Sequence, residues 1–233
     1  MRPDIMAMGV MWYVVFLLSL TCHEASHALA AKLGGDLTAF HGGQVTLNPI
    51  PHMRREPFGT ILVPIISYAL GGWMIGWASA PYDPGWRYRY PHRAALMALA
   101  GPAANVVLLL IAGAAIRLSM ATGAFALPAS VRFTHLVAAS TGPIEGVATF
   151  LSILFSLNLL LAAFNLLPFP PLDGNSVVGL LMSEDTARRF ATLTRTPPFA
   201  VFGLLIGWYM FGYIFHPLFG AALRVLYSGI ADR

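Results

Sequence analysis

The sequence predicts an all-α polytopic membrane protein, with about five apolar helical segments and a short membrane-associated β-hairpin after the first helix. Hydrophobic residues make up 57% of its 233 residues and charged residues only 10%, against about 45–50% and 25% in soluble domains. This composition argues against a disordered chain and an ordinary soluble globule. Because no repeat or linker divides the sequence, we expect a single membrane-embedded domain over residues 1–233, with a motif-bearing core at about 5–183 and a C-terminal helical segment at about 197–228.

The helical segments are predicted from stretches that contain no Asp, Glu, Lys or Arg. Each meets the threshold of about 18 apolar residues for a membrane span. Buried core helices are the alternative, but a chain of 233 residues cannot enclose so many of them. The stretches are Ile5–His23, Phe58–Ala80, Ala94–Ile116, Gly146–Leu172 and Pro197–Leu223.

The first apolar stretch is similar to a secretory signal peptide, because Arg2 precedes it and Ala28-Leu29-Ala30 follows it like a cleavage site. A His-Glu pair separates the apolar stretch from that site, and four more apolar stretches follow. We therefore expect the first helix to remain in the mature protein.

The charges favour a membrane protein over a nucleic-acid-binding one. Fourteen Lys and Arg against ten Asp and Glu give a net charge of +4, and the basic residues are scattered through short loops. Because they form no stripe with interleaved aromatic residues, we expect no nucleic-acid partner. Cys22 is the single cysteine, which excludes a disulfide within the chain.

The β-hairpin is predicted at Leu37–Asn48. Gly42-Gly43 is typical of a hairpin turn, and the apolar Val45 and Leu47 alternate with polar residues after it.

Two acidic residues, Glu24 and Asp173, interrupt apolar helical sequence. An acid at bilayer depth costs about 2.5–3.5 kcal/mol on insertion scales, so both are candidate functional residues. Glu24 lies between His23 and His27, which are four residues apart and share one face of a helix. Two imidazoles in this arrangement can bind one Zn²⁺, and Glu24 can reach a metal-bound water as general base. The alternative, a polar packing cluster, would bury three polar groups without a function.

Asp173 is the candidate for a third metal ligand. A catalytic zinc ion takes three protein ligands and keeps one open position, and no other acid lies at depth in an apolar stretch. Pro168, Pro170 and Pro171 break the fourth segment just before Asp173, which lets its carboxylate face a polar cavity. Asp173 also suits the N-cap of a following helix, and both roles are compatible.

Three motifs together resemble the site-2 protease family of intramembrane zinc metalloproteases. They are the pattern HEASH at residues 23–27, the segment Ala100–Asn105 and the segment Asn165–Gly174. Their order and spacing are similar to those of that family, and residues 44–64 resemble its compact prokaryotic type, which lacks a PDZ or CBS domain.

The resemblance implies a zinc-dependent endopeptidase that hydrolyses peptide bonds in or near transmembrane segments. It implies one zinc ion per chain, with His23, His27 and Asp173 as ligands and Glu24 as catalytic base. It also implies that Asn165 holds the substrate or polarises its carbonyl group. The alternative is that Asn165 satisfies backbone groups freed by the prolines.

The resemblance further implies a transmembrane protein or peptide as substrate, within a lipid bilayer. The predicted hairpin would pair with an extended substrate. The active site would lie near the cytoplasmic face of a prokaryotic cell (inner) membrane. Gly101 and Asn105 are expected to serve close helix packing.

Two other functions fit parts of the pattern. His23 and His27 match a histidine box of membrane di-iron oxygenases or desaturases, although this chain has seven histidines and no second cluster. A transporter or chaperone-like membrane protein could use Glu24 and Asp173 to bind ions. Metal analysis and a Glu24→Gln variant separate these alternatives from a protease.

The charges also predict the topology. If all five stretches cross once, the Lys and Arg residues divide seven to seven, which gives no orientation under the positive-inside rule. If Phe58–Ala80 enters and leaves on one side, nine of them gather there against five. We therefore predict a re-entrant second segment and a cytoplasmic Tyr82–Arg93 loop. Because Ile5–Cys22 spans about 27 Å as a helix, His23 is expected near the same face.

Overall fold

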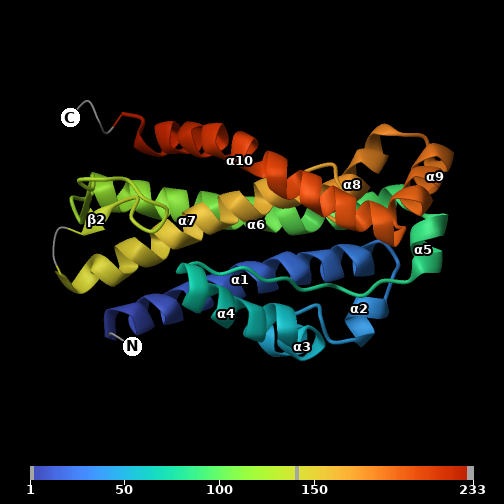
Figure 1. Cartoon of the computed structure of the whole chain (residues 1–233), viewed down its shortest axis with the longest axis horizontal. Coiled ribbons are helices and arrows are strands. Elements are labelled where there is room, and N and C mark those ends of the chain that lie inside the picture. The colour runs from blue at the N-terminus through green and yellow to red at the C-terminus, as the bar shows by residue number, and fades with distance from the viewer. Residues whose placement is uncertain (1–2, 140–141, 230–233) are drawn as a thin grey trace.

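The computed structural model describes residues 3–139 and 142–229, which form a bundle of long helices (Figure 1). Four of the helices, α1, α6, α7 and α10, are long and apolar enough to cross a membrane. The helices are α1 (Pro3–Leu33), α2 (Thr38–His41), α3 (Pro49–Arg55), the π-helical turn η1 (Phe58–Leu62), α4 (Val63–Gly71), α5 (Pro84–Arg89), α6 (Pro91–Ala121), the 3₁₀ turn η2 (Gly142–Ile144), α7 (Glu145–Asn165), α8 (Asp173–Val177), the 3₁₀ turn η3 (Val178–Leu181), α9 (Glu184–Thr194) and α10 (Pro197–Tyr227). The strands are β1 (Phe125–Ala126) and β2 (Ala138–Ala139).

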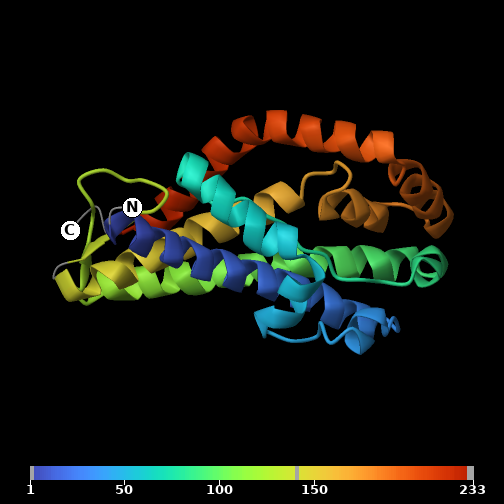
Figure 2. The same ribbon diagram turned by 60° about the horizontal axis from the view of Figure 1, so that its bottom comes forward.

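Helices α1, α6 and α7 pack on one another and form the centre of the bundle. Phe16, Ile116 and Ile153, one from each helix, are almost fully buried in a shared apolar cluster. Helix α10 lies over α7 and leaves most of its apolar side chains exposed, as expected for a helix that faces lipid (Figure 2).

The expected count of about five apolar helical segments is not confirmed, because four helices are long and apolar enough to cross a membrane and the second stretch folds back on itself. It forms η1 and α4, and α4 ends at Gly72, whose φ of +74° is the left-handed conformation that glycine adopts freely. The chain then returns so that the Trp77 N–H donates to the Gly59 carbonyl at 3.1 Å. Ser79 Oγ also donates to Glu56 Oε1 at 2.6 Å. The segment thus begins and ends at the same end of the molecule, as the re-entrant prediction required.

The returning segment, residues 73–80, is extended and runs alongside α1 (Figure 1). Its side chains alternate between buried or half-buried at even positions and exposed at odd positions. This period of two is the pattern of a β-strand with one face on the protein, although no strand partner is present among the described residues. Hydropathy alone cannot separate such a strand from a helix, because both are apolar here.

The predicted β-hairpin at Leu37–Asn48 is wrong. Residues Thr38–His41 form the short helix α2, and Gly43, with a φ of +69°, ends it. Asp36 starts the helix, because its Oδ1 accepts hydrogen bonds from the N–H of Thr38 at 2.9 Å and from its hydroxyl at 2.6 Å. The two glycines therefore terminate a helix and do not join two strands.

Asp36 also ties the end of α1 to the loop before α5. Its Oδ2 accepts from the N–H of Asp83 at 2.8 Å. Burial on its own would raise the pKa of Asp36, but the hydrogen bonds from Thr38 and Asp83 outweigh it and hold the pKa below its usual value.

The small sheet of the described residues lies elsewhere. Strands β1 and β2 pair antiparallel, with Phe125 opposite Ala139. They belong to the loop between α6 and α7, at the opposite end of the molecule from α5 and α9 (Figure 1).

Candidate metal centre

Helix α1 places His23 and His27 on one face, as the spacing predicted. Their Nε2 atoms lie 2.9 Å apart, and both side chains are buried. Only 5% of the surface of His23 and 6% of that of His27 is exposed, so the two rings lie inside the bundle.

Asp173 completes the group from a distant part of the chain. Its Oδ2 lies 3.2 Å from His23 Nε2 and 3.3 Å from His27 Nε2. The proline-containing loop after α7 brings it there, and α8 begins at Asp173. The N-cap position of α8 is Leu172 and no side chain caps it, so the carboxylate of Asp173 is directed to the histidines and not to its own helix.

Close backbone packing fixes this position. A Cβ atom at Gly174 would collide with the carbonyl oxygens of Leu166 and Leu167. Glycine is therefore required next to Asp173, because any side chain would push α8 away from the end of α7.

The outer nitrogens of the two imidazoles are held by hydrogen bonds. His23 Nδ1 lies 2.6 Å from Asn105 Oδ1, and His27 Nδ1 lies 2.7 Å from the carbonyl oxygen of Met97. Because carbonyl oxygens only accept, each Nδ1 carries the proton and each Nε2 of a neutral ring keeps its lone pair. Two lone pairs and a carboxylate oxygen thus converge on one point.

This donor set fits a zinc ion. A tetrahedral zinc with bonds of about 2.0–2.1 Å to nitrogen or oxygen separates its ligand atoms by roughly 3.3 Å, and the three atoms here lie 2.9–3.3 Å apart. A Cβ atom at Gly101 of α6 would collide with both Nε2 atoms, so the absence of a side chain there leaves the space open. Among the described residues, His23, His27 and Asp173 are the one group of this kind.

Glu24 is buried beside this group, with 4% of its surface exposed. Its Oε2 has no hydrogen-bond partner among the described residues. A buried carboxylate oxygen without a partner is costly, and a water molecule bound at the centre would supply one.

A network of buried polar side chains stands behind His23, and sequence reasoning missed it. Asn105 Nδ2 donates to Asn158 Oδ1 at 2.8 Å, and Asn158 Nδ2 donates to Ser19 Oγ at 2.9 Å. Asn105 was expected only to allow close packing, and Asn158 was not singled out. The signal that could have found them is an asparagine inside a charge-free stretch, because a buried amide needs partners.

Asn165 is not joined to the centre by any hydrogen bond in the structure. It lies at the end of α7, where its Nδ2 donates to the Leu161 carbonyl at 3.0 Å. The Leu161 carbonyl lies inside α7 and is not one of the groups freed by the prolines, so both the alternative and a role toward substrate stay predictions.

The fold and the centre together define a membrane protein with a metalloprotease-type site. The profile described as "Peptidase family M50" matches residues 11–200. The chain therefore belongs to peptidase family M50. It is 35% identical over 222 residues to "Putative zinc metalloprotease YwhC" of Bacillus subtilis, and the match covers 93% of this chain and 90% of that protein.

Two mycobacterial relatives carry a similar description. The chain is 33% identical over 176 residues to "Putative zinc metalloprotease Rip2" of Mycolicibacterium smegmatis, a match covering 76% of this chain and 59% of that protein. The protein of the same name from Mycobacterium tuberculosis is 30% identical over 231 residues, covering 94% and 78%. No solved structure matches the chain.

Proposed function

We propose that this protein is a zinc-dependent intramembrane endopeptidase that hydrolyses peptide bonds in or near transmembrane segments of other membrane proteins. The observation that carries the proposal is the convergence of His23, His27 and Asp173 beside the buried Glu24, on helices apolar enough to cross a membrane. Neither the di-iron enzyme nor the transporter is favoured, because the family is one of peptidases and its relatives here are described as zinc metalloproteases.

The residues divide the chemistry between them. Bound zinc supplies Lewis acidity, which polarises the scissile carbonyl and acidifies a water molecule. Glu24 takes the proton of that water and delivers it to the leaving amine. The Asn105 side chain and the Met97 carbonyl accept hydrogen bonds from Nδ1 of His23 and His27, respectively, and so keep the two imidazoles oriented for zinc.

The decisive experiment is cleavage of single-span substrates by the purified, reconstituted protein. Cleavage should stop when a zinc chelator is added and return when zinc is restored. A purified protein that retains zinc but cleaves no single-span substrate, or one that cleaves equally well after zinc removal, would contradict the proposal.

Asn105 and Asn165 are expected to have separable roles. Asn105→Leu removes the partner of His23 Nδ1 and should weaken zinc binding by about 10–100-fold, as loss of such outer partners does. Asn165→Leu should leave zinc binding unchanged and lower kcat/KM, because its role is toward substrate. Zinc titration and cleavage kinetics of both variants check this. Normal kinetics in Asn165→Leu would show that Asn165 has no role toward substrate.

Residues 73–80 take the place of the predicted hairpin as the segment that pairs with substrate. Gly76 packs against Phe16, while Ala80 packs in the cluster of Ala28 and Ala31. The residues between therefore pass α1 at the level of the metal centre. A substrate helix must be unwound before attack, and an unpaired strand can hold it by main-chain hydrogen bonds.

One edge of this segment is free for such pairing. The N–H groups of Ile75 and Trp77 are bonded to Ser67 Oγ and the Gly59 carbonyl, on one side. The N–H groups of even-numbered residues point the other way, and Ala78 N has no hydrogen bond among the described residues.

The variant Ala78→Pro tests the free edge, because proline removes the N–H while fitting extended backbone. We expect kcat/KM to fall by up to about tenfold, the value of one hydrogen bond, with zinc content unchanged. Ala78→Ser is the matched control, since it keeps the N–H and should cleave normally. Equal activity in both variants would show that the substrate does not pair with this edge at Ala78.

We place the metal centre near the cytoplasmic face of a prokaryotic cell membrane. Trp86 Nε1 and Arg93 donate to the Gly34 carbonyl at 3.0 and 3.1 Å, so the Tyr82–Arg93 loop lies at the end of α1 that follows His27. This end gathers nine of the 14 basic residues, which the positive-inside rule assigns to the cytoplasm.

The orientation can be checked with a single cysteine at the exposed Tyr88, in a Cys22→Ala background. A membrane-impermeant thiol reagent should label it in inside-out vesicles and not in intact cells. Labelling in intact cells would show that the protein has the opposite orientation.

A further inference from the structure

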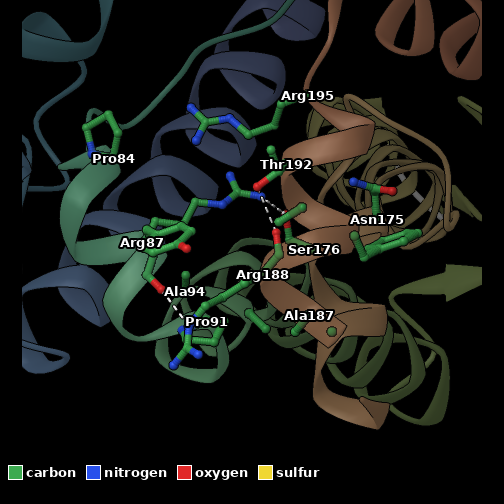
Figure 3. Close-up of a pocket in the computed structure, with 15 residues that line it drawn as sticks. Pro84, Arg87, Pro91, Ala94, Asn175, Ser176, Ala187, Arg188, Thr192 and Arg195 are labelled. Carbon is green, nitrogen blue, oxygen red and sulfur yellow. Dashed lines mark hydrogen bonds between the residues drawn. The ribbon is translucent and has the colours of Figure 1, made fainter. Parts of the chain in front are cut away.

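A cavity lies away from the metal centre, at the end of the molecule that carries α5 and α9. Its volume is about 230 Å³, and its walls come from α5, the start of α6, α8, η3 and α9. Its lining includes the small residues Ala94, Ala95 and Gly179. Arg87, Arg188 and Arg195 also line it (Figure 3). The cavity therefore combines small apolar residues with three guanidinium groups.

Two of these arginines carry uncompensated charge. Arg87 donates to Tyr82 Oη and to Ser176 Oγ, both at 2.9 Å and both neutral. Arg195 stacks over the same Tyr82 ring, 5.6 Å from its centroid. Neither forms an ion pair with a carboxylate among the described residues, whereas Arg188 is paired with Glu184.

The cavity also presents hydroxyl groups next to these guanidinium groups. Figure 3 shows Arg87 extending from α5 toward Ser176 of α8, and Arg195 extending from the opposite side toward α5. Ser176 and Thr192 both line the cavity, but Thr192 Oγ1 donates to the Arg188 carbonyl at 2.9 Å, so Ser176 is the hydroxyl that can donate into the cavity. Guanidinium groups combined with hydroxyl groups are the donors that recognise phosphate oxygens.

The cavity lies at the level of lipid headgroups. Arg195 lies two residues before α10, and Pro91 and Ala94 belong to the first turns of α6. Both helices are candidate membrane spans. Basic pockets between helices on the cytoplasmic side bind lipid headgroups of opposite charge. A volume of about 230 Å³ is below the roughly 300–1,000 Å³ of pockets for drug-sized ligands, so it suits a headgroup and not a whole lipid.

We propose that this cavity binds the phosphate group of an anionic phospholipid, held by Arg87 and Arg195 with the hydroxyl of Ser176. This inference does not depend on the proposed peptidase activity. A bound phosphate would join α5 and α9 to α8, the helix that begins with the metal-site residue Asp173. The lipid would thus stabilise the placement of α8 against the rest of the bundle.

The test uses the full-length protein in nanodiscs that mix phosphatidylcholine with phosphatidylglycerol. Native mass spectrometry should find one phosphatidylglycerol retained per chain. Arg195→Gln should lower this retention by about tenfold, the effect of losing one charge-assisted hydrogen bond. Arg195 is exposed, so its replacement leaves the packing of the bundle intact.

Arg189→Gln is the matched control, because Arg189 is an exposed arginine of the same helix and does not line the cavity. It should retain lipid as the unchanged protein does. Arg87→Lys keeps the positive charge but removes the planar guanidinium group with its paired N–H donors, and this variant should also lose lipid. An equal loss in Arg189→Gln, or full retention in Arg195→Gln, would overturn the proposal.

A second arm separates lipid from free phosphate. Phosphatidylglycerol should raise the melting temperature of the unchanged protein in detergent, and inorganic phosphate should neither do so nor displace the lipid. If inorganic phosphate matches the lipid in both measurements, the cavity is a site for soluble anions and the lipid assignment is wrong.

Discussion

The variant Asp173→Asn is expected to lose zinc and all measurable cleavage. Asparagine has almost the same shape as aspartate, and the N-cap position of α8 is Leu172, so α8 should still begin at residue 173. The change removes only the anionic oxygen that lies 3.2 and 3.3 Å from the two histidines. Zinc content by metal analysis and cleavage of a reconstituted substrate are the two measurements.

The comparison with Asp185→Asn supplies the control. Asp185 is an exposed acid in the first turn of α9, paired with Arg188, and its replacement removes the same charge away from the centre. It should keep both zinc and activity. If Asp173→Asn retains full zinc and full turnover, the third ligand is another residue and the role of Asp173 is limited to its helix.

The group of candidate metal ligands could be predicted from the sequence, because three of the residues involved lie close together in the chain. His23, Glu24 and His27 lie within one and a half turns of one helix, and helix geometry alone brings the two rings together. Asp173 was found by a different argument, since an acid at bilayer depth needs a function to offset its cost. The fold-back of the second apolar stretch was predicted from charge counting, which is sensitive to the side on which each loop lies. Its re-entry in a membrane stays a prediction.

The parts that sequence reasoning missed depend on contacts between distant residues. Asn105 and Asn158 are 53 residues apart, and Asn158 and Ser19 are 139 apart, so no local pattern connects them. The cavity between α5, α8 and α9 likewise combines short helices that pack together only in the folded bundle. The hairpin prediction failed for a local reason, because Asp36 accepts from Thr38 and starts a helix where a glycine pair favoured a turn between strands.

Glu24→Gln is expected to separate zinc binding from catalysis. Glutamine keeps the length and shape of the side chain but cannot take a proton from water. Because the proposed metal ligands are His23, His27 and Asp173, zinc should remain bound. Turnover should fall by about 10²–10⁴-fold, the usual contribution of a general base. Cleavage kinetics and metal analysis of the same preparation measure both quantities.

The combination of retained zinc and lost turnover distinguishes a base from a structural residue. Glu24 is 4% exposed and its Oε2 has no partner among the described residues. Because glutamine has nearly the same shape and volume, the replacement should not destabilise the fold. Asp173→Asn, by contrast, loses zinc and turnover together. If Glu24→Gln also loses zinc, Glu24 acts as a ligand. If it keeps normal turnover, the proton is taken by another group and the proposed mechanism is wrong.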